Sequence, residues 1–282
     1  MADGTDGFAV KLWRSRSGRA GIILCSLIVL AAFCAPLITL YNPLEMGVGT
    51  RLSGPSGQHP MGTDEYGRDI MTRILYGARI SIVAGVGAVL IASFVGVNTG
   101  MVAGYFGGAL DSVLMRIMDA IISFPATLMA IVVIAIIGTN SLSSILAIAI
   151  VNIPTFARLT RANVLSEIRK GYVEANRALG FSHTRIMYQE ILPNVLSTLF
   201  VQITVSIANA IMLESALSFL GLGNPPPAPS WGSMLSTGKD YMLYAPTYAI
   251  FPGLSLTVLI VGLYLLGDGL RDVFDSRQSG GR

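Results

Sequence analysis

Five long runs of this 282-residue chain contain no Asp, Glu, Lys or Arg, and they constrain its fold more than any other feature. The runs are Ala20–Leu40, Ile80–Leu110, Ala120–Ala157, Ile191–Leu213 and Tyr241–Gly267. A helix needs about 20 such residues to cross a bilayer, and in lipid only a helix or a closed barrel satisfies every backbone polar group. The chain is 52% hydrophobic and only 12% charged. The sequence therefore predicts an all-helical protein that crosses a membrane several times.

The run Ala120–Ala157 is too long for one span and contains a turn at Gly138–Ser141, so we predict six spans. Their approximate limits are Ala20–Leu40, Ile80–Ala103, Leu114–Ile137, Leu142–Phe156, Val195–Leu220 and Tyr248–Leu266. Pro125 should kink or unwind the third span. The first span has too long an apolar core for a cleaved signal peptide, and Cys34-Ala35-Pro36 is a poor cleavage site. We therefore expect it to be a retained anchor.

Basic residues are distributed unevenly between the segments that join these spans, and Lys and Arg favour the cytoplasmic side. With the N-terminus inside, most of the 19 basic residues are cytoplasmic: Lys11, Arg14, Arg16, Arg19, Arg116, Arg158, Arg161, Arg169, Lys170, Arg177, Arg185, Arg271, Arg277 and Arg282. Arg51, Arg68, Arg73, Arg79 and Lys239 then lie outside. We predict cytoplasmic termini and a cytoplasmic insert at 157–192. Since topology accounts for these charges, the net charge of +3 gives no reason to expect a nucleic-acid partner.

External loops are expected at 41–79 and Gly221–Ala245. Within Asp69–Arg79, apolar residues recur at helical spacing, which predicts an interfacial helix that leads into the second span. The second span is rich in Gly and Ala, which let helices approach closely in lipid. Packing within the chain, packing against a second membrane subunit and lining of a pathway all remain open as explanations.

The polar insert at 157–192 is predicted to contain three short helices, Asn163–Lys170, Tyr172–Leu179 and His183–Glu190. Gly180 suits the residue after a helix end, where a left-handed turn favours glycine, and Ser182 suits a helix N-cap. Such short helices are marginal in water without a partner. The partner surface could be another protein or the lipid headgroups.

The insert resembles the "EAA" loop of bacterial ABC importer permeases. Its Glu174-Ala175-Asn176 is followed by Gly180 and then by Glu190-Ile191-Leu192-Pro193, against a family pattern of EAA-x3-G-x9-I-x-LP. Asn176 replaces the second Ala of this pattern, and Glu190 replaces the Ile before x-LP. In that family the loop docks into a cytoplasmic ATPase subunit. The resemblance implies an ATPase-coupling role for Tyr172, Val173, Glu174, Ala175, Leu179, Gly180, Leu192 and Pro193.

Two further stretches are similar to the C-type permease of dipeptide, oligopeptide and nickel importers. One is His59–Asp69, HPMGTDEYGRD, and the other is Ser215–Gly223, SALSFLGLG, with Pro229-Ser230-Trp231-Gly232. The resemblance implies a type I ABC importer permease fold with a core at 80–269, preceded by a tail at 1–19, an anchor at 20–40 and an external loop at 41–79, and followed by a tail at 270–282. It also suggests contacts with an external binding protein at Asp64, Arg68, Asp69 and Trp231.

The implied partners are a second, homologous permease, two cytoplasmic ABC ATPases, an external solute-binding protein and membrane lipid. The implied location is the bacterial inner membrane. The chain has no Walker A motif, and we expect no catalytic residue and no cofactor in it, because ATP and Mg²⁺ would bind to the ATPases. His59 and His183 should lie on opposite sides of the membrane, so we expect no shared metal site.

Two acidic residues lie within or beside the spans, Glu214 and Asp119. A charge at membrane depth is costly and often functional, which makes both candidates for a pathway or a gate. The alternative for Glu214 is a helix-end carboxylate that reaches water or pairs locally. The alternative for Asp119 is an ion pair with Arg116 one turn earlier on the same helix.

The resemblance thus implies a permease subunit that moves peptides, namely di- or oligopeptides, delivered by a binding protein. A nickel or metal-chelate permease of the same family is the alternative. A stand-alone secondary transporter would need intramembrane charges arranged as an ion-coupling relay, for which only Asp119 and Glu214 are candidates. A membrane-embedded enzyme has no motif in its favour.

Overall fold

The computed structural model describes residues 8–279, and every regular element in this range is helical. The helices are α1 (Phe8–Arg14), α2 (Arg16–Phe33), α3 (Ala35–Ile38), α4 (Ile70–Phe106), α5 (Gly108–Ile122), α6 (Ala126–Ile137), α7 (Ser141–Glu167), α8 (Gly171–Ala178), α9 (His183–Arg185), the π-helix η1 (Ile186–Ile191), α10 (Leu192–Phe219), α11 (Trp231–Asp240) and α12 (Thr247–Ser279). The predicted all-helical fold class is confirmed.

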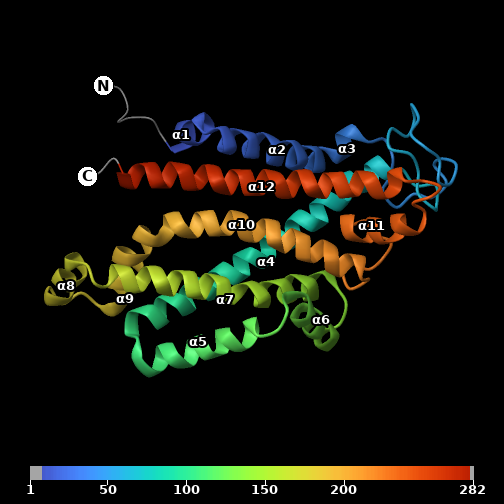
Figure 1. Cartoon of the computed structure of the whole chain (residues 1–282). Coiled ribbons are helices and arrows are strands. Elements are labelled where there is room, and N and C mark those ends of the chain that lie inside the picture. Colours follow the sequence, from blue (N-terminus) through green and yellow to red (C-terminus); the bar gives the residue numbers. More distant parts are fainter. Residues whose placement is uncertain (1–7, 280–282) are drawn as a thin grey trace.

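The long helices form an elongated bundle whose two ends differ in character (Figure 1). α1, the end of α12, and α8 with α9 lie at one end, and the loop before α4 lies with α11 at the other. α2 packs along α12, α10 lies between α12 and α7, and α4 crosses the bundle to pack against α7. α1, the end of α12 and the insert therefore share one end of the bundle, as the predicted topology requires.

Five helical segments are long and apolar enough to span a membrane, and α5 with α6 makes a sixth if this bent pair counts as one span. The pair bends by 93° at the break before Pro125, where the sequence predicts a kink or an unwound turn. Pro125 has extended backbone angles and precedes the first residue of α6. The predicted third span is therefore two helices that meet almost at a right angle.

Several predicted boundaries are wrong. The helix expected over Asp69–Arg79 is not a separate element, because α4 runs unbroken from Ile70 to Phe106. The fourth span does not end near Phe156, since α7 continues through Pro154 to Glu167 and absorbs most of the predicted Asn163–Lys170 helix. The predicted helix Tyr172–Leu179 corresponds to α8, which begins one residue earlier, at Gly171, and ends at Ala178.

Small residues on α4 let it lie directly against α7. A Cβ added at Gly96 would lie 2.6 Å from the carbonyl oxygen of Ile153, and one added at Gly100 would overlap the carbonyl oxygen of Ala157. At Gly104 it would lie 2.9 Å from Cβ of Val164. At these three positions the small residues of α4 serve packing within the chain.

Candidate functional site

The polar insert contains a short helix, α8, that is closed by a glycine turn. Gly180 has a φ of +76°, and its N–H donates to the carbonyl oxygen of Arg177 at 3.0 Å. The N–H of Phe181 donates to the carbonyl oxygen of Asn176 at 3.1 Å. These two bonds make a Schellman turn, which satisfies the last carbonyls of a helix. The predicted role of Gly180 as the residue after the helix end is confirmed.

α8 has one buried side chain and several that face outward. Val173 is fully buried in an apolar cluster with Met101 and Tyr105 of α4 and with Ile186 and Ile191 of η1. Glu174, Ala175 and Leu179 are exposed, and Leu179 is 72% exposed. Val173 therefore attaches α8 to the bundle, while the other three are available to a partner.

Tyr172 connects α8 to both neighbouring long helices. Its hydroxyl donates to Oε2 of Glu167 at 2.8 Å, and Nδ2 of Asn194 donates to the same hydroxyl at 3.2 Å. Glu167 also pairs with Lys170 at 2.6 Å. Burial of the phenol, together with the bond to Glu167, raises the pKa of Tyr172 to about 12. The tyrosine thus stays a neutral donor that links the end of α7 to the start of α10.

Residues 179–182 separate α8 from α9, and continuous helix then runs from α9 to α10. Ser182 caps α9 by accepting from the N–H of Arg185, as its sequence position predicts. The six residues of η1 then form a π-helix that continues into α10, where Leu192 and Pro193 are the first two residues. Single π-turns of this kind often lie near functional sites. A movement of α9 can therefore pass into α10 along continuous helix, and α8 acts on this segment through its side-chain contacts.

The opposite end of the bundle is held together by buried charges. Asp64 is fully buried and pairs with Arg68, whose Nη2 also lies 3.2 Å from Oε1 of Glu65. Nε of Arg73 on α4 lies 3.4 Å from the Asp64 carboxylate, and its Nη1 donates to the carbonyl oxygen of Pro43 at 2.8 Å. These contacts fold the loop 41–69 onto the start of α4.

Asp69 and Trp231 complete this end. Asp69 caps α4 by accepting from the N–H of Thr72 at 2.7 Å, and it bonds to Nδ1 of His59 at 2.9 Å. The indole of Trp231 is fully buried and donates to the carbonyl oxygen of Ile74 at 3.0 Å.

None of the four residues predicted to contact a binding protein is exposed. Asp64, Arg68, Asp69 and Trp231 are each at most 5% exposed. They hold the shape of this end of the molecule from inside, so any effect of these residues on docking has to be indirect.

Glu214 lies inside the bundle and is 2% exposed. Its carboxylate accepts from the hydroxyl of Ser81 on α4 at 2.8 Å and from that of Ser218 at 2.7 Å. This local pairing, which the sequence leaves open as an alternative, ties α4 to α10.

Asp119 is about half exposed and does not pair with Arg116. It forms an ion pair with Arg158 of α7. The alternative predicted for Asp119, an ion pair with Arg116, is therefore wrong. The pairing occurs between helices because the bend at Pro125 leaves α5 lying along α7.

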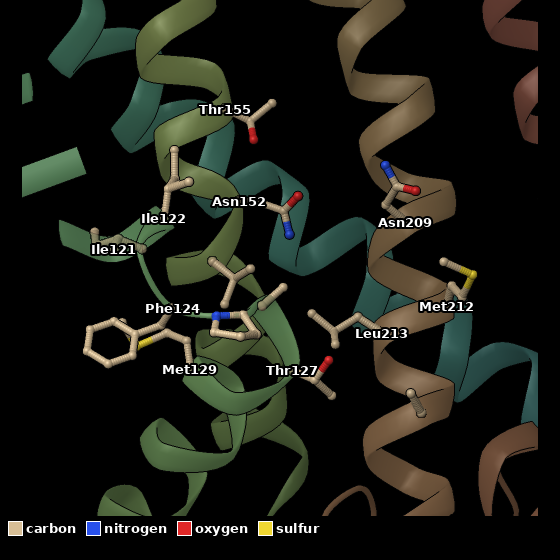
Figure 2. A pocket seen from close by; sticks show the side chains of 14 residues that line it. Ile121, Ile122, Phe124, Thr127, Met129, Asn152, Thr155, Asn209, Met212 and Leu213 are labelled. Atoms are coloured by element: carbon tan, nitrogen blue, oxygen red, sulfur yellow. The ribbon is translucent and has the colours of Figure 1, made fainter. Parts of the chain in front are cut away.

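A pocket of about 620 Å³ lies between α6, α7 and α10, beside the bend that separates α5 from α6. Figure 2 shows Asn152 and Thr155 on α7, Asn209 on α10 and Thr127 on α6 around it. Its lining, taken over the described residues, includes neither Glu214 nor Asp119 and carries no charged side chain.

Sequence reasoning missed this pocket. A signal for it is present in the sequence, because Asn152 and Asn209 are amides within long uncharged runs.

Residues 8–279 contain no group of three or more His, Cys, Asp or Glu side chains arranged to hold a metal ion. His59 and His183 lie at opposite ends of the bundle, where His59 bonds to Asp69 and His183 bonds to the hydroxyl of Tyr105 at 2.9 Å.

Residues 96–280 match the family described as binding-protein-dependent transport system inner membrane component. The dipeptide transport system permease protein DppC of Alkalihalophilus pseudofirmus is 41% identical over 268 residues, which are 95% of this chain and 88% of that protein. The glutathione transport system permease protein GsiD of Pectobacterium atrosepticum is 41% identical over 259 residues, which are 92% of this chain and 86% of that protein.

A solved structure supports the same fold. A chain from the MetNI methionine ABC transporter in an inward-facing conformation superposes with a TM-score of 0.60 and 19% identity, covering 72% of this chain and 97% of that one. At this identity the likeness concerns the fold alone.

Proposed function

Because this chain belongs to the family of binding-protein-dependent transport system inner membrane components, we propose that it is the permease subunit of an ATP-driven importer that carries peptides across a bacterial inner membrane. The observation that carries the proposal is the alignment of 95% of the chain with a dipeptide permease at 41% identity. The glutathione permease aligns over 92% of the chain and is named for another small peptide-like solute. Di- and tripeptides are therefore the proposed cargo.

In this proposal the chain supplies a pathway, and its partners supply the energy. A second, homologous permease completes the membrane part, two ABC ATPases bind and hydrolyse ATP in the cytoplasm, and an external binding protein delivers the peptide. The proposed permease core at 80–269 carries the insert on the cytoplasmic side, which is also the side proposed for both termini. The assignment is supported by the shared end of the bundle on which α8, α1 and the end of α12 lie.

We assign ATPase coupling to α8 and the turn at Gly180. Glu174, Ala175 and Leu179 are exposed and would contact the ATPase, while Val173 and Tyr172 transmit the movement inward. Val173 presses on α4 and η1, and Tyr172 is bonded to α7 through Glu167 and to α10 through Asn194. One displacement of α8 would then move the inner ends of three long helices together, which changes the access of the pathway.

Affinity purification of the tagged chain from its native membrane in mild detergent tests the assembly. Recovery of a second permease and two P-loop ATPases, identified by mass, is the expected result. Competition for labelled dialanine uptake by dipeptides, glutathione and a nickel chelate in whole cells then tests the cargo. Competition by the chelate alone would replace the peptide proposal with a metal-chelate importer. A chain recovered without any ATPase would contradict the proposed coupling.

A further inference from the structure

The pocket between α6, α7 and α10 combines apolar walls with a few neutral polar groups. Asn152 lies near the middle of α7, and Asn209 lies on the exposed face of α10 that also carries Met212 and Ala216. Both helices are candidate membrane spans, so these amides lie at membrane depth. An amide turned toward lipid tails would lack hydrogen-bond partners, at a considerable cost. This face of the bundle is therefore suited to a pathway rather than to lipid.

Each asparagine already uses one half of its amide within the protein. Nδ2 of Asn152 donates to the carbonyl oxygen of Ile148 on its own helix at 2.8 Å. Oδ1 of Asn209 accepts from the hydroxyl of Tyr264 on α12 at 2.7 Å. These bonds fix which end of each amide points away from its helix.

The two remaining halves are complementary. Oδ1 of Asn152 is an acceptor to which no residue within 8–279 donates, and Nδ2 of Asn209 is a donor for which this range provides no acceptor. Figure 2 shows the two side chains on opposite walls of the pocket. The pocket thus offers one acceptor and one donor, together with the hydroxyls of Thr127 and Thr155.

One acceptor and one donor match the N–H and the C=O of a single peptide bond. Given the proposed function, on which this inference rests, we propose that Asn152 and Asn209 form a peptide-backbone subsite in the transport pathway. Asn152 Oδ1 accepts the N–H of the passing peptide, and Asn209 Nδ2 donates to its carbonyl oxygen. Thr127 and Thr155 supply further neutral hydrogen bonds.

This arrangement explains why the subsite does not select among side chains. Backbone groups are common to all peptides, and the apolar walls, which include Phe124, Met129 and Met212, have no charge that would favour one side chain over another. Neutral hydrogen bonds contribute little net free energy, so the peptide is guided without being trapped. Selection among peptides would then rest with the partner that delivers them.

Backbone-modified dipeptides test the subsite in the reconstituted transporter, with its second permease, its ATPases and its binding protein present. In alanyl-lactic acid an ester oxygen replaces the N–H of dialanine, and in thiodialanine a weakly accepting sulfur replaces the carbonyl oxygen. We measure kcat/KM for uptake of each compound relative to dialanine. Comparing variants of the permease with one binding protein removes the preference of the binding protein from the comparison.

The wild-type transporter should prefer dialanine to the ester by about fivefold beyond the preference of the binding protein, as expected for one neutral hydrogen bond. Asn152→Leu should abolish that part of the preference and leave the discrimination against thiodialanine unchanged. Asn209→Leu should have the converse effect.

Asn98→Leu is the matched control. Asn98 on α4 also donates to its own helix, at Phe94, and also accepts from a tyrosine hydroxyl, that of Tyr188, but it lies outside this pocket. Its selectivity ratios should equal those of the wild type.

Unchanged ratios in Asn152→Leu and Asn209→Leu, with dialanine still transported, would overturn the subsite and show that the amides only pack against another subunit. Failure of the wild-type transporter to take up dialanine would instead overturn the proposed function. If the leucine variants fail to assemble, the subsite is tested in the wild-type transporter by photolysis of a bound dipeptide that carries a diazirine. Crosslinks within α6, α7 and α10 support the subsite, and crosslinks only elsewhere contradict it.

Discussion

At the scale of single residues, the turn that ends α8 depends on Gly180, whose φ is +76°. An added Cβ would meet no atom within 4 Å, so a substitution acts through backbone strain alone. A left-handed conformation costs an L-residue about 1–2 kcal/mol, which is about a 5- to 30-fold change in an equilibrium. Gly180→Ala should therefore loosen the turn and raise the ATP hydrolysed per peptide transported.

Gly171→Ala is the matched control for this prediction. Gly171 begins α8, also has open space around it, and does not have a positive φ. The ratio of ATP hydrolysed to peptide transported should stay at the wild-type value in this variant. Equal ratios for Gly180→Ala and the wild type would count against a coupling role for the turn.

Glu214 is the residue whose removal should most affect the joint between α4 and α10. Glu214→Leu leaves the hydroxyls of Ser81 and Ser218 without the carboxylate that they bond to. Buried polar groups without partners cost about 1–3 kcal/mol each. We expect a lower Tm for Glu214→Leu in detergent than for Glu214→Gln, which keeps an acceptor in the same place. A Leu variant that melts at or above the Gln variant would contradict this structural role.

The sequence predicts some of these residues better than others. Gly180 and Ser182 can be assigned from sequence because their roles are local, depending on backbone conformation and on a cap within a few residues. Asn152 and Asn209 are about 57 residues apart in the chain and meet at one pocket only through the packing of α7 and α10. The pairing of Asp119 with Arg158 likewise depends on how α5 lies against α7.

At the scale of elements, α8 has one buried side chain, that of Val173, in addition to the hydrogen bonds of Tyr172. Val173 is fully buried, and Val173→Ala removes two methyl groups from its cluster. The loss is about 2 kcal/mol from the area and cavity effects combined. Amide hydrogens of α8 should then exchange faster, as measured by mass spectrometry of the purified complex, while those of α10 stay protected.

Leu179→Ala tests the proposed contact of α8 with the ATPase separately from the attachment of α8 to the bundle. Leu179 is 72% exposed, so its truncation should leave hydrogen exchange in α8 unchanged in the isolated permease. It should reduce coupling if this side chain contacts the ATPase as proposed. Equal exchange in Val173→Ala and Leu179→Ala would refute the attachment through Val173.

The contact of α4 with α7 gives a second prediction at this scale. Gly100→Ala places a Cβ against the carbonyl oxygen of Ala157 and 2.8 Å from Cβ of Thr160. Overpacking of this kind costs about 1–3 kcal/mol. Gly87→Ala on the same helix meets nothing closer than 3.8 Å, at Ile145. The Tm of Gly100→Ala should fall below that of Gly87→Ala, and the reverse order would refute the close packing.

Helix boundaries show where sequence reasoning fails at this scale. The uncharged runs locate the spans, because lipid requires long apolar segments. They do not locate the ends of α4 and α7, because both helices continue beyond the apolar run into polar sequence that the rest of the bundle supports. Pro125 allows the break in the third span to be predicted from the sequence, but the 93° angle between α5 and α6 is set by packing.

At the scale of the whole molecule, one end of the bundle carries α8, α1 and the end of α12, and the other carries a compact cap formed by the loop 41–69 and α11. The cap is held by Asp64, Arg68, Arg73 and Trp231, whose side chains are buried. The two ends are joined by long helices that pass the amide-lined pocket. This arrangement suits a subunit that receives cargo at one end and a mechanical input at the other.

ATP-driven uptake of labelled dialanine into proteoliposomes tests this account most directly. The vesicles contain the co-purified transporter, ATP is enclosed with the ATPases, and the binding protein is added on the other side. The account predicts peptide accumulation that requires both ATP and the binding protein and that is lost with a non-hydrolysable ATP analogue. Accumulation that follows a proton or sodium gradient without ATP would contradict it and identify the chain as a secondary transporter.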